Sequence, residues 1–252
     1  MAELLFWPAI VGYGEAAIAY ASPRYTRMGT WGVRIGWIAQ SALLAVQAAR
    51  ADGFPWTSWA GSLNLFVWFV VATYLIWGCQ QRYRLIGLTV MPLAALLFVV
   101  SRVGGGTAAG VRSQYGNVFL VIHVGFVLAA FAGFTLAAAL AALYLREERR
   151  LQRRSPDILR LRLPSLVVLE RLTNRTIAIS MPLLTVGLVA GFIRLREEHG
   201  RVDALMGLAI VTWLLYAFYV VARPGGRSGA RLALAGFVLV IVARVALAGS
   251  HF

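Results

Sequence analysis

Long apolar runs separated by short polar segments dominate this sequence. The longest, Asn117 to Leu145, carries no formal charge and has His123 as its one polar interruption of chemical consequence. Only a membrane-spanning helix accommodates an apolar run of this length. Together with seven further runs it predicts eight spans, at about 2–21, 32–49, 59–79, 85–101, 117–145, 176–193, 204–222 and 232–250. We therefore expect an all-α membrane protein, a polytopic bundle of eight transmembrane helices in a single integral domain, 1–252.

Composition supports this fold class. The 252 residues are 60% hydrophobic and 13% charged, with a mean hydropathy of +0.74, which is more apolar surface than a soluble domain needs. The net charge of +14 comes from arginine alone, and these arginines lie mostly in loops between spans. They are explained by topology and by contacts with anionic lipid, so we expect no nucleic-acid partner. Glu3 stands where a signal peptide has a basic region, so none is expected.

The arginines also predict the orientation. Alternate loops hold seventeen arginines on one side of the bilayer and six on the other. Because arginine-rich loops remain in the cytoplasm, both termini are predicted to be extracytoplasmic, in a multi-pass protein of the bacterial cytoplasmic (inner) membrane. Residues 146–175 then form a cytoplasmic basic connector, an amphipathic segment on the membrane surface interrupted at Pro164. Residues 194–203 form an outer loop.

In this topology all three histidines fall on the outer side. His123 lies about 34 Å from the inner anchor Arg146, and His251 about 30 Å from Arg231, at 1.5 Å per helical residue. His199 lies in the outer loop. A metal or haem site at the outer face would explain this shared level, and simple tolerance of histidine at the interface is the alternative. A metal at His199 is disfavoured against a solvated charged loop.

Other outer residues could complete such a site. Arg244 lies two turns below His251 on nearly the same helix face, where it could meet a carboxylate such as a haem propionate or extend to the headgroups. Trp56 and Trp59 are placed either as interfacial belt residues or as walls for a flat apolar ligand.

Two features inside predicted spans concern helix packing. Glu15 lies in the inner half of the first span, where Arg34 is a candidate ion-pair partner. Gly187-x-x-x-Gly191 indicates close approach of two helices.

Enzymatic chemistry of the ordinary hydrolytic type is not expected. The sequence has no paired carboxylates, no serine or cysteine nucleophile beside a histidine, and no H-E-x-x-H. Cys79 is the only cysteine, which excludes an intrachain disulfide, a thiolate cluster and a C-x-x-C-H haem attachment site. Any haem would be held without a thioether bond.

Four segments carry a resemblance to a known family. They are IHVGFVLAAFAGFTLAAALAALYLREERRLQRR, LPSLVVLERLTNRTIAISMPLLTVGLVAGF, VDALMGLAIVTWLLYAFYVVAR and the terminal LAGSHF. Over about the last 140 residues the chain resembles the cytochrome c assembly proteins of the CcsA/CcmC type, specifically their HemX-like branch. The resemblance implies a histidine on each side of an outer loop, ligating haem from opposite faces. Those positions are His123 and His251.

Two departures refine what the resemblance implies. Synthetase members have a tryptophan-rich WWD signature in this loop, whereas here the loop reads GFIRLREEHGRVD and keeps only Asp203. They also have a second histidine pair inside the membrane, which this chain lacks. Both departures argue against a haem–cytochrome ligase. The HemX-like branch instead implies a haem-handling or regulatory protein linked to glutamyl-tRNA reductase.

We therefore expect a non-enzymatic membrane protein that binds haem b non-covalently, with His123 and His251 as axial ligands of the iron. The residues expected around the haem are arginines that meet the propionates (Arg244, Arg112 and Arg194) and aromatic walls (Trp56 and Trp59). Two alternatives stay open: a haem transporter feeding cytochrome c biogenesis, and a cofactor-free scaffold that recruits a cytosolic enzyme. The expected partners are haem, the lipid bilayer, and glutamyl-tRNA reductase or cytochrome c assembly components.

Overall fold

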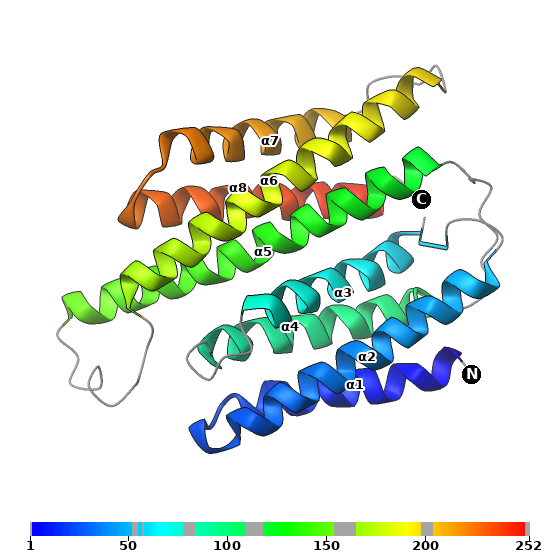
Figure 1. The fold of residues 1–252 in the computed structure, drawn as a ribbon, viewed down its shortest axis with the longest axis horizontal. Helices are drawn as coiled ribbons and strands as arrows, with labels where there is room; N and C mark the ends of the chain where they lie inside the picture. The colour runs from blue at the N-terminus through cyan, green and yellow to red at the C-terminus, as the bar shows by residue number, and fades with distance from the viewer. Residues whose placement is uncertain are drawn as a thin grey trace. The chain divides into compact units, whose positions relative to one another are not determined.

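The computed structural model describes residues 2–51, 55–56, 58–77, 84–108, 118–153, 165–197 and 204–249, and these residues are almost entirely helical. The elements are α1 (Ala2–Ala19), the 3-10 helix η1 (Pro23–Tyr25), α2 (Thr26–Arg50), α3 (Trp59–Trp77), α4 (Arg84–Val103), α5 (Val118–Gln152), α6 (Leu166–Glu197), α7 (Ala204–Ala222) and α8 (Gly226–Gly249) (Figure 1). Each predicted span falls on one α-helix, so the all-α fold class is confirmed.

Length and composition identify the helices that can cross a membrane. Within the described residues, four helices (α3, α4, α5 and α6) are long and apolar enough. Shorter apolar segments, Leu4–Ala19 and Met206–Ala222, lie in α1 and α7. Large apolar side chains such as Ile18 and Ile76 are 78% and 72% exposed, as expected of surfaces that face lipid. The chain is a multi-pass membrane protein, while the count of eight spans and the placement of both termini outside stay predictions.

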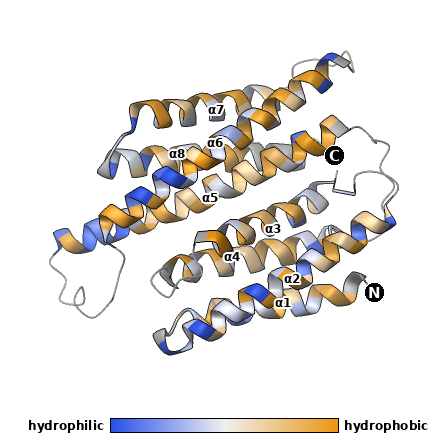
Figure 2. Cartoon of the chain, in the orientation of Figure 1, coloured by the Kyte–Doolittle hydropathy of each residue, from blue (hydrophilic) through white to orange (hydrophobic). Residues whose placement is uncertain are grey.

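The structure differs from the sequence prediction at the basic connector. α5 continues to Gln152 and α6 already begins at Leu166, so both ends of the predicted connector 146–175 belong to helices. The apolar pattern marks where the bilayer ends, but good helix formers and the Glu147–Arg150 ion pair at 3.5 Å continue the helix beyond it. Figure 2 shows hydrophilic residues at these helix ends. Residues 154–164, with Pro164, lie outside the described residues.

The chain divides into two compact units, Met1–Val121 and Ile122–Phe252. In the first, α1 packs on α2 and α4, and α3 completes a four-helix bundle by packing on the same two helices. A Cβ on Gly12 would lie 2.5 Å from the Gly32 carbonyl oxygen and 2.9 Å from the Gly36 nitrogen, so only glycine permits this approach of α1 and α2. The single integral domain stays a prediction.

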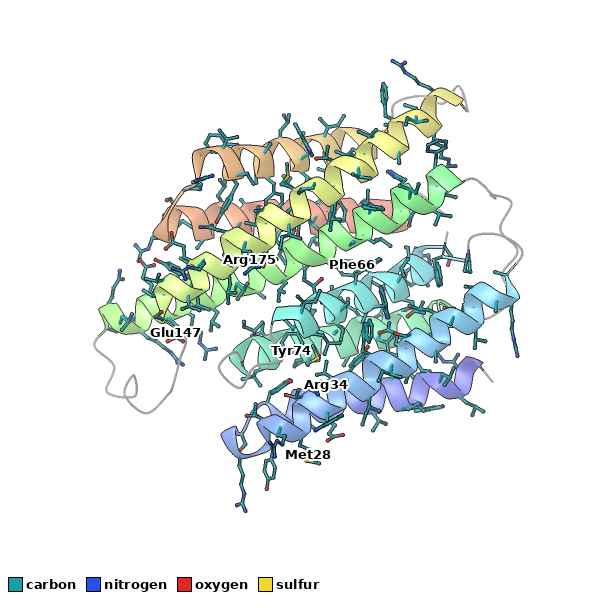
Figure 3. The ribbon with its side chains drawn as sticks, in the orientation of Figure 1. Met28, Arg34, Phe66, Tyr74, Glu147 and Arg175 are labelled. Carbon is teal, nitrogen blue, oxygen red and sulfur yellow. The ribbon has the colours of Figure 1, made fainter. Side chains whose placement is uncertain are left out.

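Large aromatic residues fill the core of the first unit. Tyr13, Tyr20, Tyr74 and Phe98 are fully buried, and Figure 3 labels Tyr74 on α3. The rings of Tyr20 and Tyr74 meet edge to face, with centroids 6.2 Å apart. The hydroxyl of Tyr74 and the ring of Tyr20 both lie against Gly87 of α4, where an added Cβ would collide with them. The glycine therefore sets the spacing of α4 from its neighbours.

Arg34 of α2 does not have the partner suggested by the sequence. Figure 3 labels Arg34 on α2. Its guanidinium lies over the ring of Trp31, 5.2 Å from the centroid, and none of the ion pairs within the described residues joins it to Glu15. Residues 31 and 34 are neighbours on one helix face, so the cation–π contact forms locally. The side chain of Glu15 instead lies beside Gly32, where α1 and α2 approach closely.

The second unit contains α6, α7 and α8 packed on one another, with α5 joined through aromatic and small residues. Phe134 of α5 stacks on Tyr216 of α7 with centroids 3.7 Å apart and an interplanar angle of 4°. A Cβ on Gly236 of α8 would lie 2.5 Å from the Tyr216 ring, which therefore occupies the space left by that glycine. Gly133 of α5 likewise packs directly against Ser180 of α6.

Candidate functional site

His123 is the one histidine among the described residues, and it lies near the start of α5. Its half-buried imidazole is hydrogen-bonded to α6, with Nδ1 2.7 Å from the main-chain carbonyl oxygen of Gly187. A carbonyl oxygen can only accept, so Nδ1 is the donor and carries a proton. In the neutral ring, Nε2 then keeps its lone pair and is available to coordinate a metal.

Two glycines of α6 make room for this histidine. A Cβ on Gly191 would lie 2.5 Å from Nδ1 and 2.6 Å from Cε1 of His123. A Cβ on Gly187 would lie 2.7 Å from Cγ2 of Val127, one turn further along α5. The sequence pattern Gly187-x-x-x-Gly191 predicted helix packing, and the structure shows that the imidazole itself is packed there.

Arg194 adds positive charge to this region. It lies one turn beyond Gly191 on α6. The neighbouring Arg196 lies over the ring of Phe192, with the guanidinium carbon 4.8 Å from the centroid. An imidazole packed on α6, with an arginine one turn further along that helix, suits a ligand that combines a metal ion with a carboxylate, as haem does.

Several predicted site residues cannot be compared with this arrangement. His251 and Arg112 lie outside the described residues, as does His199. Arg244 belongs to α8, but its side chain is not among those described. The pairing of His123 with His251 therefore stays a prediction. Within the described part of the chain, no group of three or more His, Cys, Asp or Glu residues is placed to hold a metal ion.

Trp56 and Trp59 belong to the first unit. The indole nitrogen of Trp56 donates a hydrogen bond to Oε1 of Gln47, 3.2 Å away. The Trp59 ring packs against Gly104, where a Cβ would lie 2.5 Å from it. Both tryptophans thus have defined contacts at the end of that bundle, and their role as walls of a haem site stays a prediction.

Beside these tryptophans lies a buried amide network that the sequence analysis missed. Tyr13 donates to Oε1 of Gln40 at 2.6 Å, and Nε2 of Gln40 donates to Oδ1 of Asn64 at 2.9 Å. Asn64 donates to Oε1 of Gln47 at 3.2 Å and to the carbonyl oxygen of Gly106 at 3.1 Å. The network ties α1, α2 and α3 to the segment that follows α4. Gln40 and Gln47, seven residues apart on one face of α2, were the signal available in the sequence.

At the end of the second unit away from His123, charged side chains form contacts between helices. Arg227 of α8 donates from Nε to Oε2 of Glu148 at 3.0 Å and from Nη2 to Oε1 of Gln152 at 3.2 Å. The main-chain nitrogen of Gly226 donates to Oε1 of Glu170 at 3.1 Å, so this carboxylate satisfies the N-terminus of α8. A small pocket between these helices is too confined for more than water. Its lining residues are Ala141, Tyr144, Glu170, Thr173, Tyr219, Pro224, Gly226, Gly229 and Ala230.

Comparison with known proteins gives consistent similarities. The model of the family described as cytochrome C assembly protein matches residues 56–248. The cytochrome c biogenesis protein CcsA of Gloeothece citriformis is 26% identical over 294 residues, covering 95% of this chain and 90% of that protein. CcsA of Microcystis aeruginosa is also 26% identical, over 95% and 89% of the two chains. CcsA of Mesostigma viride is 24% identical over 91% and 86%.

Proposed function

Because this chain belongs to the cytochrome c assembly protein family, we propose that it is a haem-handling membrane protein that holds b-type haem non-covalently at its outer face. His123 and His251 are the proposed axial ligands of the iron. Cys79 is the only cysteine, so the chain cannot attach its own haem through two thioether bonds.

The hydrogen bond between His123 and Gly187 carries the proposal. It orients the imidazole and leaves Nε2 as the unprotonated nitrogen, which is the state a haem ligand requires. Haem supplies the iron and a flat apolar ring with two carboxylates. The chain contributes the ring nitrogens, a site partly sheltered by α6, and arginines for the carboxylates.

Arg194 and Arg244 are the proposed partners of the haem propionates. The roles of Arg112, Trp56 and Trp59, which belong to the first unit, stay predictions from the sequence. Arg194 is the best supported of these residues, because it lies one turn beyond Gly191, the residue of α6 that packs against the His123 ring. A guanidinium binds a carboxylate through two parallel hydrogen bonds, which fixes the orientation of the ligand as well as adding affinity.

The relatives' name favours a role in cytochrome c biogenesis. In that role the chain would bind haem at the outer face and pass it to other assembly components, without covalent catalysis of its own. Membership of the HemX-like branch and regulation of glutamyl-tRNA reductase stay predictions.

Absorption spectra of the protein purified from haem-sufficient cells test the proposal. Two imidazole ligands leave no open position on the iron, so we expect a Soret band of six-coordinate, low-spin character. His123→Ala or His251→Ala should leave five-coordinate or weakly bound haem, and the double variant none. His199→Ala is the control and should have a smaller effect. A double variant with an unchanged Soret band, or loss of haem in His199→Ala alone, would contradict the ligand assignment.

A further inference from the structure

We propose that Gly187 and Gly191 of α6 are positioning residues for His123: the carbonyl of Gly187 selects the Nδ1-protonated form of the imidazole, and Gly191 leaves the space that the ring occupies. The consequence for iron rests on the proposed haem function. The geometry of the imidazole does not, and it can be tested without haem.

The space at Gly191 is the first part of the argument. An added Cβ would lie 2.5 Å and 2.6 Å from two ring atoms of His123, closer than real Cβ atoms approach their neighbours. The ring lies between the two helices and cannot simply swing away while it keeps its bond to Gly187. Even alanine at this position must therefore displace the imidazole or separate α5 from α6.

The carbonyl of Gly187 is the second part. It lies 2.7 Å from Nδ1, within the range of a good hydrogen bond, and it belongs to the main chain, so it is an acceptor at every pH. It therefore favours one tautomer permanently. A backbone acceptor on the far ring nitrogen also makes the coordinating nitrogen more basic.

The chain offers a closely matched control. Gly125 lies two residues from His123 on the same helix, and a Cβ there would meet nothing within 4 Å. Gly125→Ala and Gly191→Ala add the same methyl group to the same region. Only the second should change the state of the imidazole.

The test that needs no haem is nitrogen NMR of haem-free protein carrying ¹⁵N-labelled histidine in lipid nanodiscs, with His123→Gln to assign the His123 signals. At a pH where the ring is neutral, we expect a protonated Nδ1 and an unprotonated Nε2 in the wild type and in Gly125→Ala. Gly191→Ala should show a mixture of both tautomers. A wild-type ring protonated at Nε2, or a Gly191→Ala spectrum identical to the wild type, would overturn the inference.

The second test restores a ligand chemically. In His123→Gly, added imidazole should restore the low-spin spectrum, because it can occupy the vacated space and donate to Gly187. We expect 1-methylimidazole to be about fivefold less effective, the difference corresponding to one neutral hydrogen bond. Adding Gly191→Ala should weaken rescue by imidazole, whereas adding Gly125→Ala should not.

The two tests separate the inference from the proposed function. If the wild type binds no haem but shows the expected tautomer, the haem proposal fails and the positioning role stands. If haem binds with a low-spin spectrum but the two imidazoles rescue equally, or Gly191→Ala has no effect on the tautomer, the positioning role fails. A Gly191→Ala protein that does not fold still leaves the wild-type tautomer and the comparison of the two imidazoles as decisive results.

Discussion

The amide of Asn64 is the centre of the buried network in the first unit, and its replacement by leucine gives a quantitative prediction. The side chain accepts one hydrogen bond from Gln40 and donates two, to Gln47 and to the carbonyl of Gly106. Leucine has a similar size and removes all three bonds without opening a large cavity. The resulting decrease in the free energy of unfolding therefore measures the contribution of the hydrogen bonds.

The expected cost follows from the remaining partners. Nε2 of Gln40 keeps its bond to the main-chain oxygen of Asn64 at 3.0 Å, and Oε1 of Gln47 keeps the indole of Trp56. No large penalty for an unsatisfied buried group is added. Hydrogen bonds between membrane helices average about 0.6 kcal/mol each. Three of them predict a loss of about 2 kcal/mol, with an upper limit of about 5 kcal/mol if each has the largest measured value of about 1.7 kcal/mol.

Equilibrium unfolding in mixed micelles with increasing sodium dodecyl sulfate, followed by helix content, measures this loss. Thr73→Val in the same helix is the control, since the Thr73 hydroxyl bonds only to the carbonyl of Phe69 in its own helix, at 2.8 Å. We expect the control to change the free energy of unfolding by less than about 0.5 kcal/mol. If Asn64→Leu costs no more than Thr73→Val, the network does not stabilise the bundle and the reasoning is refuted.

Three further outcomes are expected. Gly12→Ala should lower the free energy of unfolding by about 1–3 kcal/mol, because the added methyl group meets the backbone of α2. Gly14→Ala is the control, since the space around Gly14 is open, and it should be neutral or stabilising. Equal effects of the two substitutions would refute the close packing. Arg223 has a φ of 45°, so Arg223→Gly should raise stability in the same assay by about 1 kcal/mol, and no gain would contradict the strain. A reporter enzyme fused after Phe252 should be active only outside the cytoplasm, and one at Gln152 only inside; the reverse pattern would overturn the predicted topology.

The apolar pattern was sufficient to predict every α-helix of the described chain, because a buried or lipid-facing helix needs apolar residues throughout. It located membrane spans and not helix ends, so α5 and α6 extend beyond the predicted spans. Beyond the apolar core, charged residues such as Glu147 and Arg150 continue the helix through local pairs. Helix ends that extend into water must be predicted from helix propensity instead.

From the sequence, the residues of the candidate site could be identified, but the contact between them could not. His123 stood out as a polar residue in an apolar helix, and Gly187-x-x-x-Gly191 indicated close packing. Their meeting was not visible, because the partner of His123 is a main-chain carbonyl that any residue type possesses. The amide network had a signal in Gln40 and Gln47, since polar residues repeated on one face of a membrane helix require partners.

α5 is one continuous helix. It runs from Val118 to Gln152 without a proline, so His123 and the helix end at Gln152 are about 44 Å apart along its axis. If the helix pivots as a rigid body, a rotation of about 0.5° at the far end displaces the imidazole by about 0.4 Å, more than the tolerance of about 0.2 Å expected for a metal–ligand bond. The position of the His123 imidazole therefore depends in part on the other end of α5. There, Arg227 of α8 donates hydrogen bonds to Glu148 and Gln152 of α5.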